Sequence, residues 1–215
     1  MDAIKADEIV QATLSQGNEA LGKLMDADVI AISAPMMFGL DDVIKNEIEN
    51  ICESKEEGDP EKDRLVVMLE TTGGYIEVVE RIVSVFRQHY KEVCFLVPNY
   101  AYSAGTVLAL SGDELYMNYY SVLGPIDPQF EMENGRSVPG MGYIAKYNSL
   151  IKIINSVDDD KIGTVRAEMS FLIKKFDPAH LFHIEQAIKD SQELLEKWLP
   201  KYKFKSWKKT SSGKK

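Results

Sequence analysis

Two short segments of the sequence hold residues that could perform chemistry: TTGG at 71–74 and YSAG at 102–105. Two adjacent glycines allow backbone conformations and close approaches that other residues do not. The N–H groups at the start of a following helix can then bind a negatively charged oxygen. A serine hydroxyl becomes a nucleophile when a base removes its proton. Taken singly, the glycines would also fit a plain tight turn, and Ser103 a plain helix N-cap.

The pattern of apolar residues predicts the elements that must position these two segments. Apolar runs without polar alternation predict buried strands at 29–32, 65–69 and 93–97, with a further strand near 114–118. Helices are predicted over 2–26, from Asp41 onward, over 76–86 and over the small residues that end near Leu110. Buried strands separated by helices are typical of a parallel sheet covered on both faces. Both segments come after a predicted strand and before a predicted helix, at the edge of the sheet where ligands bind.

The second half of the chain has a different pattern. After Gly142 the periodicity is helical throughout, over 143–157, 161–176 and 178–199. The charged stretch at 54–63 has nothing to bury and is expected to be a mobile loop. The sequence therefore predicts an α/β domain over residues 1–200 with a C-terminal α-helical extension, followed by a basic tail over 201–215.

The composition of the 215-residue chain is that of one soluble globular domain, with 45% hydrophobic and 27% charged residues. Its net charge of −9 is uneven, because residues 201–215 hold seven lysines and no acid. The remaining acidic body argues against a nucleic-acid binder, since such proteins neutralise phosphates with lysine and arginine. Cys52 and Cys94 are typical of reduced thiols in the cytosol. No apolar run approaches the roughly 20 residues that span a bilayer. These features predict a cytoplasmic protein without a membrane span.

Together with LGPIDPQ at 123–129, the two segments resemble the Clp protease and crotonase superfamily in their order and spacing. The resemblance is greatest to the SDH serine proteinase family, which is related to signal peptide peptidase A, and it covers 29–129 well and the helical remainder loosely. It implies a Clp protease/crotonase-like parallel sheet with flanking helices. It also implies that Ser103 is the nucleophile and that the N–H groups of Gly73 and Ala104 form the oxyanion hole, with Gly74 shaping the turn.

The resemblance leaves the base of the reaction open between two kinds of residue. Where a Clp protease would carry a histidine, the segment 124–129 has none. His89, His180 and His183 are the three histidines of the chain, and a histidine triad would need one of them to fold back. The spacing of His180 and His183 with Asp177 is also too little for a metal site.

Relatives of signal peptide peptidase A instead use a serine–lysine dyad, with the lysine on a helix tens of residues after the serine. The lysines in this window are Lys146, Lys152 and Lys161. At about 100° per residue, Lys146 falls within the apolar arc of its helix, whereas Lys152 lies on the polar face and Lys161 follows an acidic run. A lysine has an ordinary pKa of about 10.4, and burial lowers it. Lys146 is therefore the lysine expected to act as the base, unless it extends its charge into water along the apolar face.

Two further features are open to a functional interpretation. Five tyrosines near Ser103 could line an apolar substrate cleft or could simply pack. They are Tyr100, Tyr102, Tyr116, Tyr119 and Tyr120. Asp127 could act like the carboxylate of a crotonase or could be a turn residue.

The resemblance predicts a serine peptidase that cleaves a peptide or unfolded protein through an acyl-enzyme, works as a homo-oligomer, and needs no metal or organic cofactor. Two alternatives are a crotonase-like acyl-CoA enzyme, in which the Gly-Gly turn polarises a thioester, and a catalytically silent scaffold or binding protein. The basic tail at 201–215 is either the start of a truncated C-terminal segment or a docking segment for the acidic body of a neighbour.

Overall fold

The computed structural model describes residues 6–54, 63–127, 129–131, 137–156, 169–174 and 176–207. Most of the predicted charged loop, the candidate Lys161 and the tail beyond Trp207 lie outside these residues. The chain forms two compact units. We call Met1–Pro125 with Glu193–Lys215 the sheet unit, and Ile126–Gln192 the helical unit.

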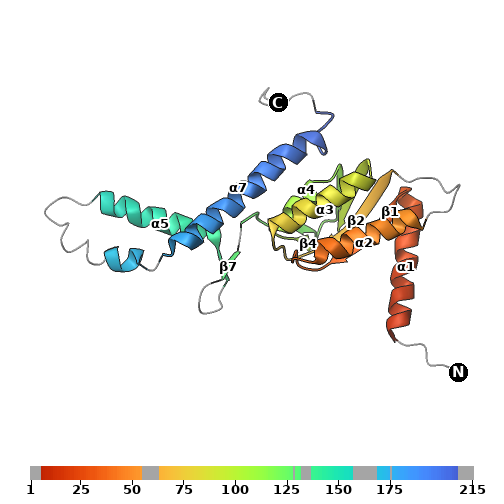
Figure 1. The fold of residues 1–215 in the computed structure, drawn as a ribbon, viewed down its shortest axis with the longest axis horizontal. Coiled ribbons are helices and arrows are strands. Elements are labelled where there is room, and N and C mark those ends of the chain that lie inside the picture. The colour runs from red at the N-terminus through yellow and green to blue at the C-terminus, as the bar shows by residue number, and fades with distance from the viewer. Residues whose placement is uncertain are drawn as a thin grey trace. The chain divides into compact units, whose positions relative to one another are not determined.

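A four-stranded parallel sheet forms the centre of the sheet unit (Figure 1). The strands are β1 (Asp28–Ser33), β2 (Arg64–Glu70), β3 (Glu92–Val97) and β5 (Glu114–Met117), in the order β1-β2-β3-β5. Val66 pairs with Val29 on one side and with Cys94 on the other. Because β2 and β3 are central and buried on both faces, they are apolar at nearly every position, which is the pattern that predicted them.

Helices cover both faces of this sheet. On one face, α2 (Leu40–Glu53) and α3 (Ile76–His89) lie side by side, and α3 contributes a buried stripe that includes Val79, Ile82 and Phe86. On the other face, Leu21 and Met25 of α1 (Ala6–Met25) pack against Val66 and Cys94. The predicted α/β fold with a parallel sheet and flanking helices is confirmed.

Short β-contacts beyond the sheet join the loops at the carboxyl ends of its strands. Strand β4 (Tyr100–Ala101) pairs in parallel with β6 (Val122–Leu123). Isolated parallel bridges link Thr71 with Ala101 and Met36 with Gly74. These contacts hold the Gly-Gly segment next to the serine segment, and the sequence did not predict them.

The helical unit contains an antiparallel pair of strands and a set of helices. Strand β7 (Gln129–Glu131) pairs with β8 (Ser137–Pro139), which leads directly into α5 (Gly140–Asn155). Residues 169–173 are helical, and α7 (Pro178–Lys201) begins in this unit and ends in the sheet unit. The predicted C-terminal helices are present where the structure describes them. Among the described residues, no helix combines the length and the apolar character that crossing a bilayer requires.

The segment after α7 is attached to the sheet unit through a buried carboxylate. The side chain of Asp113 is only 4% exposed. It accepts one hydrogen bond from Lys205 at 2.7 Å and another from Arg87 at 2.6 Å. The Arg87 guanidinium also lies 3.6 Å from the centre of the Tyr202 ring. Burial alone would raise the pKa of Asp113, but the hydrogen bonds from Lys205, the Val93 N–H and Arg87 outweigh it and hold the pKa below its usual value. We call Arg87, Asp113, Tyr202 and Lys205 the Asp113 cluster.

Candidate active site

The Gly-Gly segment leaves β2 in a conformation that only glycine adopts easily. Gly73 has a φ of +93° and Gly74 a φ of +150°. A Cβ added at Gly74 would lie 2.3 Å from the carbonyl oxygen of Met36, and one at Gly73 would lie 2.6 Å from the carbonyl oxygen of Tyr102. Both glycines therefore serve a close backbone approach, which a plain tight turn would not require.

Ser103 lies in a sharp turn between β4 and α4 (Ala104–Leu110). Its φ of 51° and ψ of −122° are unusual for a residue with a side chain, and its hydroxyl makes no capping hydrogen bond to α4. The interpretation of Ser103 as a plain N-cap is therefore wrong. Strained backbone of this kind, at a residue with a half-buried hydroxyl, is found most often at functional sites.

The two segments meet in direct contact. A Cβ at Gly73 would lie only 2.8 Å from the Cβ of Ser103. Two backbone hydrogen bonds of Thr71 stabilise this contact. The Thr71 N–H donates to the Tyr100 carbonyl at 3.2 Å, and the Thr71 carbonyl accepts from the Tyr102 N–H at 3.0 Å. The structure thus brings Gly73, Gly74, Ser103 and Ala104 together at the carboxyl edge of the sheet.

The backbone donors around this contact differ in what they already bind. The Gly73 N–H, which the resemblance implies as an oxyanion donor, donates instead to the hydroxyl of Thr71 at 3.1 Å. For the N–H groups of Gly74 and Ala104, no acceptor is found among the described residues. Gly73 is buried and Gly74 is exposed, so the free donors include one that a ligand can reach.

Lys146 lies on α5 in the helical unit, whereas Ser103 lies in the sheet unit. Its side chain is exposed, as is that of Lys152 on the same helix. The described residues of the helical unit therefore do not bury Lys146, although its position on the apolar arc predicted burial. On this helix Leu150 is buried, and Tyr143 and Tyr147 pack against Phe176.

The histidines and Asp127 have structural partners. Cys52 Sγ lies 3.7 Å from His89 Nδ1, at the ends of α2 and α3. His180 Nδ1 lies 3.8 Å from Asp177 at the start of α7, and His183 contacts Phe182. Asp127 is buried and accepts the Met141 N–H at 2.8 Å, so its carboxylate satisfies a donor at the start of α5.

The five tyrosines differ in what their side chains contact. Tyr100 and Tyr102 stack with ring centres 4.9 Å apart, and a Cβ at Gly124 would collide with the Tyr102 ring. Tyr116 donates a short hydrogen bond to Glu114, while Tyr119 and Tyr120 are exposed. Tyr102 is thus the tyrosine that borders Ser103 directly.

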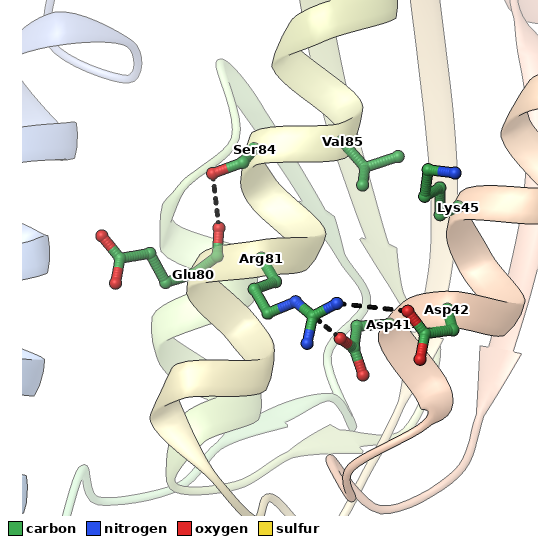
Figure 2. Close-up of a pocket in the computed structure, with 7 residues that line it drawn as sticks. All are labelled: Asp41, Asp42, Lys45, Glu80, Arg81, Ser84 and Val85. Carbon is green, nitrogen blue, oxygen red and sulfur yellow. Dashed lines mark hydrogen bonds and ion pairs between the residues drawn. The ribbon is translucent and has the colours of Figure 1, made fainter.

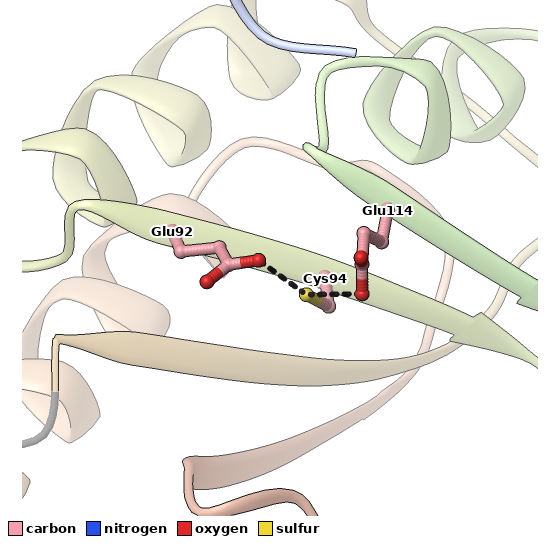
Figure 3. Close-up of side chains that lie close together, drawn as sticks. All are labelled: Glu92, Cys94 and Glu114. Carbon is pink, nitrogen blue, oxygen red and sulfur yellow. Dashed lines mark hydrogen bonds between the residues drawn. The ribbon is translucent and has the colours of Figure 1, made fainter.

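One group of potential metal ligands comes together among the described residues: Glu92, Cys94 and Glu114, whose ligand atoms lie within 4.8 Å of one another (Figure 3). Arg64 already lies 2.7 Å from Glu92 and 3.4 Å from Glu114. Burial raises the pKa of the Cys94 thiol to about 12, so the sulfur is protonated at neutral pH. Because Arg64 already balances the charge of the two glutamates and the Cys94 thiol is neutral, this group is a structural ion pair rather than a metal centre.

A pocket of about 390 Å³ lies between α2 and α3 (Figure 2). Arg81 crosses it, with Nε 2.8 Å from Asp41 Oδ2, in a geometry that is an ion pair but not a hydrogen bond, and with a second nitrogen 3.1 Å from Asp42. The pocket contains no residue of the Gly-Gly or serine segments. It is lined by Asp41, Asp42, Lys45, Glu80, Arg81, Ser84 and Val85.

Comparison with known proteins identifies one family. A family model described as ClpP-like SDH-type serine proteinase matches residues 46–162, which is more than half of the chain. The matched range includes the Gly-Gly segment, the serine segment and Lys146. The resemblance to the SDH serine proteinase family is thereby confirmed.

Two curated relatives are uncharacterized proteins of Methanocaldococcus jannaschii. One is 36% identical over 70 residues, which is 33% of this chain and 24% of the relative. The other is 34% identical over the same length and share. The match therefore spans about a quarter of the length of these relatives.

Solved structures that are similar include two of a membrane-bound stomatin-specific protease. One, a mutant in complex with a substrate peptide, has 24% sequence identity and a TM-score of 0.44, and covers 59% of this chain and 57% of that chain. The ClpP protease catalytic domain from Plasmodium falciparum has 12% identity and a TM-score of 0.38, and covers 52% of this chain and 55% of that chain.

Proposed function

This chain belongs to the ClpP-like SDH-type serine proteinase family, and we propose that it is a serine peptidase with Ser103 as the nucleophile. The observation that carries the proposal is the contact between Gly73 and Ser103, in which a strained serine turn meets a Gly-Gly turn. A free hydroxyl beside free backbone N–H groups is the arrangement that acyl transfer needs.

The reaction follows from these groups. Ser103 Oγ attacks the carbonyl carbon of a peptide bond while its proton passes to the base, and the carbonyl oxygen becomes an oxyanion beside the Gly-Gly turn and the Ala104 N–H. When the oxyanion collapses, the C–N bond breaks and the leaving amine takes the proton from the base. Water then hydrolyses the acyl-enzyme by the same steps. No metal or organic cofactor takes part in this sequence.

We assign the role of base to Lys146. A lysine amine accepts a proton only in its neutral form, which burial favours. Because Lys146 is exposed on α5, that burial has to come from outside the described part of its own unit. His180 and His183 are the alternative bases, although His180 already lies near Asp177.

The substrate class that we infer is an extended segment of a peptide or unfolded protein, bound at the exposed edge that holds Gly74 and Tyr102. We also infer a homo-oligomer. Both cysteines, Cys52 and Cys94, are free thiols, which favours the reducing cytosol.

The proposal is tested by labelling the full chain with a fluorophosphonate, which phosphonylates activated serines. We expect labelling of the parent at Ser103, none in Ser103→Ala, and much slower labelling in Lys146→Ala. Lys152→Ala is the matched control, because Lys152 is also an exposed lysine on α5. If Lys146→Ala labels like the parent from about pH 6 to about pH 9, Lys146 is not the base.

Two other results would select the alternative functions. Tight binding of coenzyme A by an unlabelled parent protein favours a crotonase-like acyl-CoA enzyme. A parent protein that neither labels nor binds coenzyme A is a scaffold or binding protein.

A further inference from the structure

We propose that Thr71 is a positioning residue of the oxyanion hole, whose side chain holds Gly73 and Gly105 so that the Gly74 N–H faces the space beside Ser103. This inference rests on the proposed function and adds a residue that the sequence alone did not single out. Thr71 is 2% exposed and does not itself reach a substrate.

The hydroxyl of Thr71 fixes the first glycine. The buried Gly73 N–H donates to Thr71 Oγ1 at 3.1 Å, so this donor is satisfied within the turn. A hydroxyl that accepts the N–H two residues later is a common way to stabilise a turn. Here it holds Gly73 at a φ of +93°, with its Cα against Ser103.

The second glycine is then turned toward the serine. In the bridge with Met36, the Gly73 carbonyl accepts from the Met36 N–H at 2.9 Å and the Tyr75 N–H donates to the Met36 carbonyl at 2.8 Å. Both hydrogen bonds of this parallel bridge are made by the neighbours of Gly74, so the N–H of Gly74 itself does not bind Met36 and is directed to the other side. On that opposite side lies the serine segment, which Thr71 joins through its bridge to Ala101.

The methyl group of Thr71 fixes the serine segment from the other direction. A Cβ added at Gly105 would lie 2.1 Å from Thr71 Cγ2 and 3.5 Å from Thr71 Cβ. Gly105 is buried in the first turn of α4, two residues after Ser103. One side chain therefore holds both the turn that carries the Gly74 donor and the turn that carries the nucleophile.

The first test compares fluorophosphonate labelling rates of Thr71→Val, Thr71→Ser and the parent. Valine keeps the shape but removes the acceptor of the Gly73 N–H, so we expect labelling at least about tenfold slower, a smaller effect than the roughly 100- to 1000-fold cost of losing an oxyanion donor itself. Serine keeps the hydroxyl but loses the methyl group that packs on Gly105, so Thr71→Ser should label more slowly than the parent but clearly faster than Thr71→Val. Thr13→Val is the control for removal of a threonine hydroxyl, because Thr13 is exposed on α1 and belongs to neither segment of the site.

The second test does not depend on catalysis. Amide hydrogen exchange followed by NMR should be faster at Gly73 in Thr71→Val than in the parent or in Thr71→Ser. Gly105→Ala should lower the melting temperature through its clash with Thr71 Cγ2. Adding Thr71→Ser should restore most of the loss, because serine lacks that methyl group.

The possible outcomes distinguish a failure of the positioning role of Thr71 from a failure of the proposed peptidase function. A folded Thr71→Val protein that labels at the parent rate overturns the positioning role, and so does Thr71→Ser labelling as slowly as Thr71→Val. Unchanged Gly73 exchange, or failure of Thr71→Ser to rescue Gly105→Ala, overturns the packing on which the role depends. A parent protein that never labels overturns the proposed function itself, and with it the catalytic meaning of Thr71, whatever the exchange data show.

Discussion

The backbone of Gly73 lies against the proposed nucleophile, and Gly39 provides a natural comparison for it. Both have a positive φ, +93° for Gly73 and +95° for Gly39. A Cβ at Gly39 would meet nothing within 4 Å, whereas one at Gly73 would meet Tyr102 and Ser103. The two positions therefore share the strain that a side chain would suffer at positive φ but differ in the collision with the serine segment.

Gly39→Ala and Gly73→Ala should consequently have different effects. At Gly39 we expect a loss of about 1–2 kcal/mol in the free energy of unfolding, which is the cost of the left-handed conformation, with labelling unchanged. At Gly73 we expect a further 1–3 kcal/mol from overpacking, roughly, and labelling of Ser103 that is at least about 100-fold slower. Urea unfolding and fluorophosphonate labelling measure the two quantities. Equal labelling rates in the two variants would contradict the contact as the basis of the site.

At the residue scale, the sequence identified the segments of the site but not all of their contacts. Gly73 and Ser103 were recognisable because a Gly-Gly turn and a serine turn each follow a buried strand. Thr71 was not, because the partner of a hydroxyl depends on the conformation of a turn that no periodic pattern encodes. The helical periodicity placed Lys146 on an apolar arc, but it could not tell what covers that arc, and the side chain is exposed.

The Asp113 cluster joins the segment after α7 to α3 and the start of β5, and its stability should depend on pH. The pKa of Asp113 is lowered in the folded protein, so the carboxylate contributes to the free energy of unfolding above its unfolded pKa of about 3.9. This contribution is lost as the pH falls through that value toward the lower folded pKa.

Asp113→Asn should therefore lower the free energy of unfolding by about 3 kcal/mol at neutral pH, because it leaves the largely buried side chain of Arg87, 12% exposed, without its counter-charge. The difference from the parent should shrink as the pH falls below about 4. Urea unfolding of both proteins at a series of pH values measures this difference in the free energy of unfolding. Asp63→Asn is the control, since Asp63 forms an exposed pair with Lys91 and should show no measurable change. A difference that is independent of pH would contradict the role of the Asp113 charge.

At the element scale, long apolar patterns were predicted and short pairings were not. The strands β1, β2, β3 and β5 and the helices between them were predicted close to their observed positions, because burial on both faces leaves an unbroken apolar run. Strands β4 and β6 have only two residues each, too few to show a period. The pairing of β7 with β8 was also missed, although an Asn-Gly dipeptide, a strong hairpin signal, lies between them in the sequence.

At the scale of the whole molecule, the described part of the helical unit leaves more large apolar side chains exposed than buried. Its buried apolar residues, where described, include Leu150 and Ile184, while several larger side chains are exposed. Phe171 is 64% exposed and Phe182 is 62% exposed. The exposed set is Met141, Ile153, Phe171, Leu172 and Phe182.

We therefore predict that the protein is a homo-oligomer whose subunits bury this surface. Light scattering coupled to size-exclusion chromatography should give a mass of at least two chains for the parent. The double variant Phe171→Ser/Phe182→Ser should shift the mass toward one chain. Tyr119→Ser is the control, because Tyr119 is fully exposed in the sheet unit and should leave the mass unchanged. A parent protein that is monomeric at micromolar concentration would contradict the prediction.

The end of α7 and the segment after it are synthesised last among the parts of the sheet unit. Residues 193–207 complete the sheet unit, yet they follow the entire helical unit in the sequence. The four strands of the main sheet all lie before Asn118 and can pair on the ribosome while Lys205 and Tyr202 are still unmade. Until those residues emerge, Asp113 has only Arg87 as its charged partner in the cluster. During synthesis the four strands can therefore pair before the residues that complete the polar contacts of the Asp113 cluster exist.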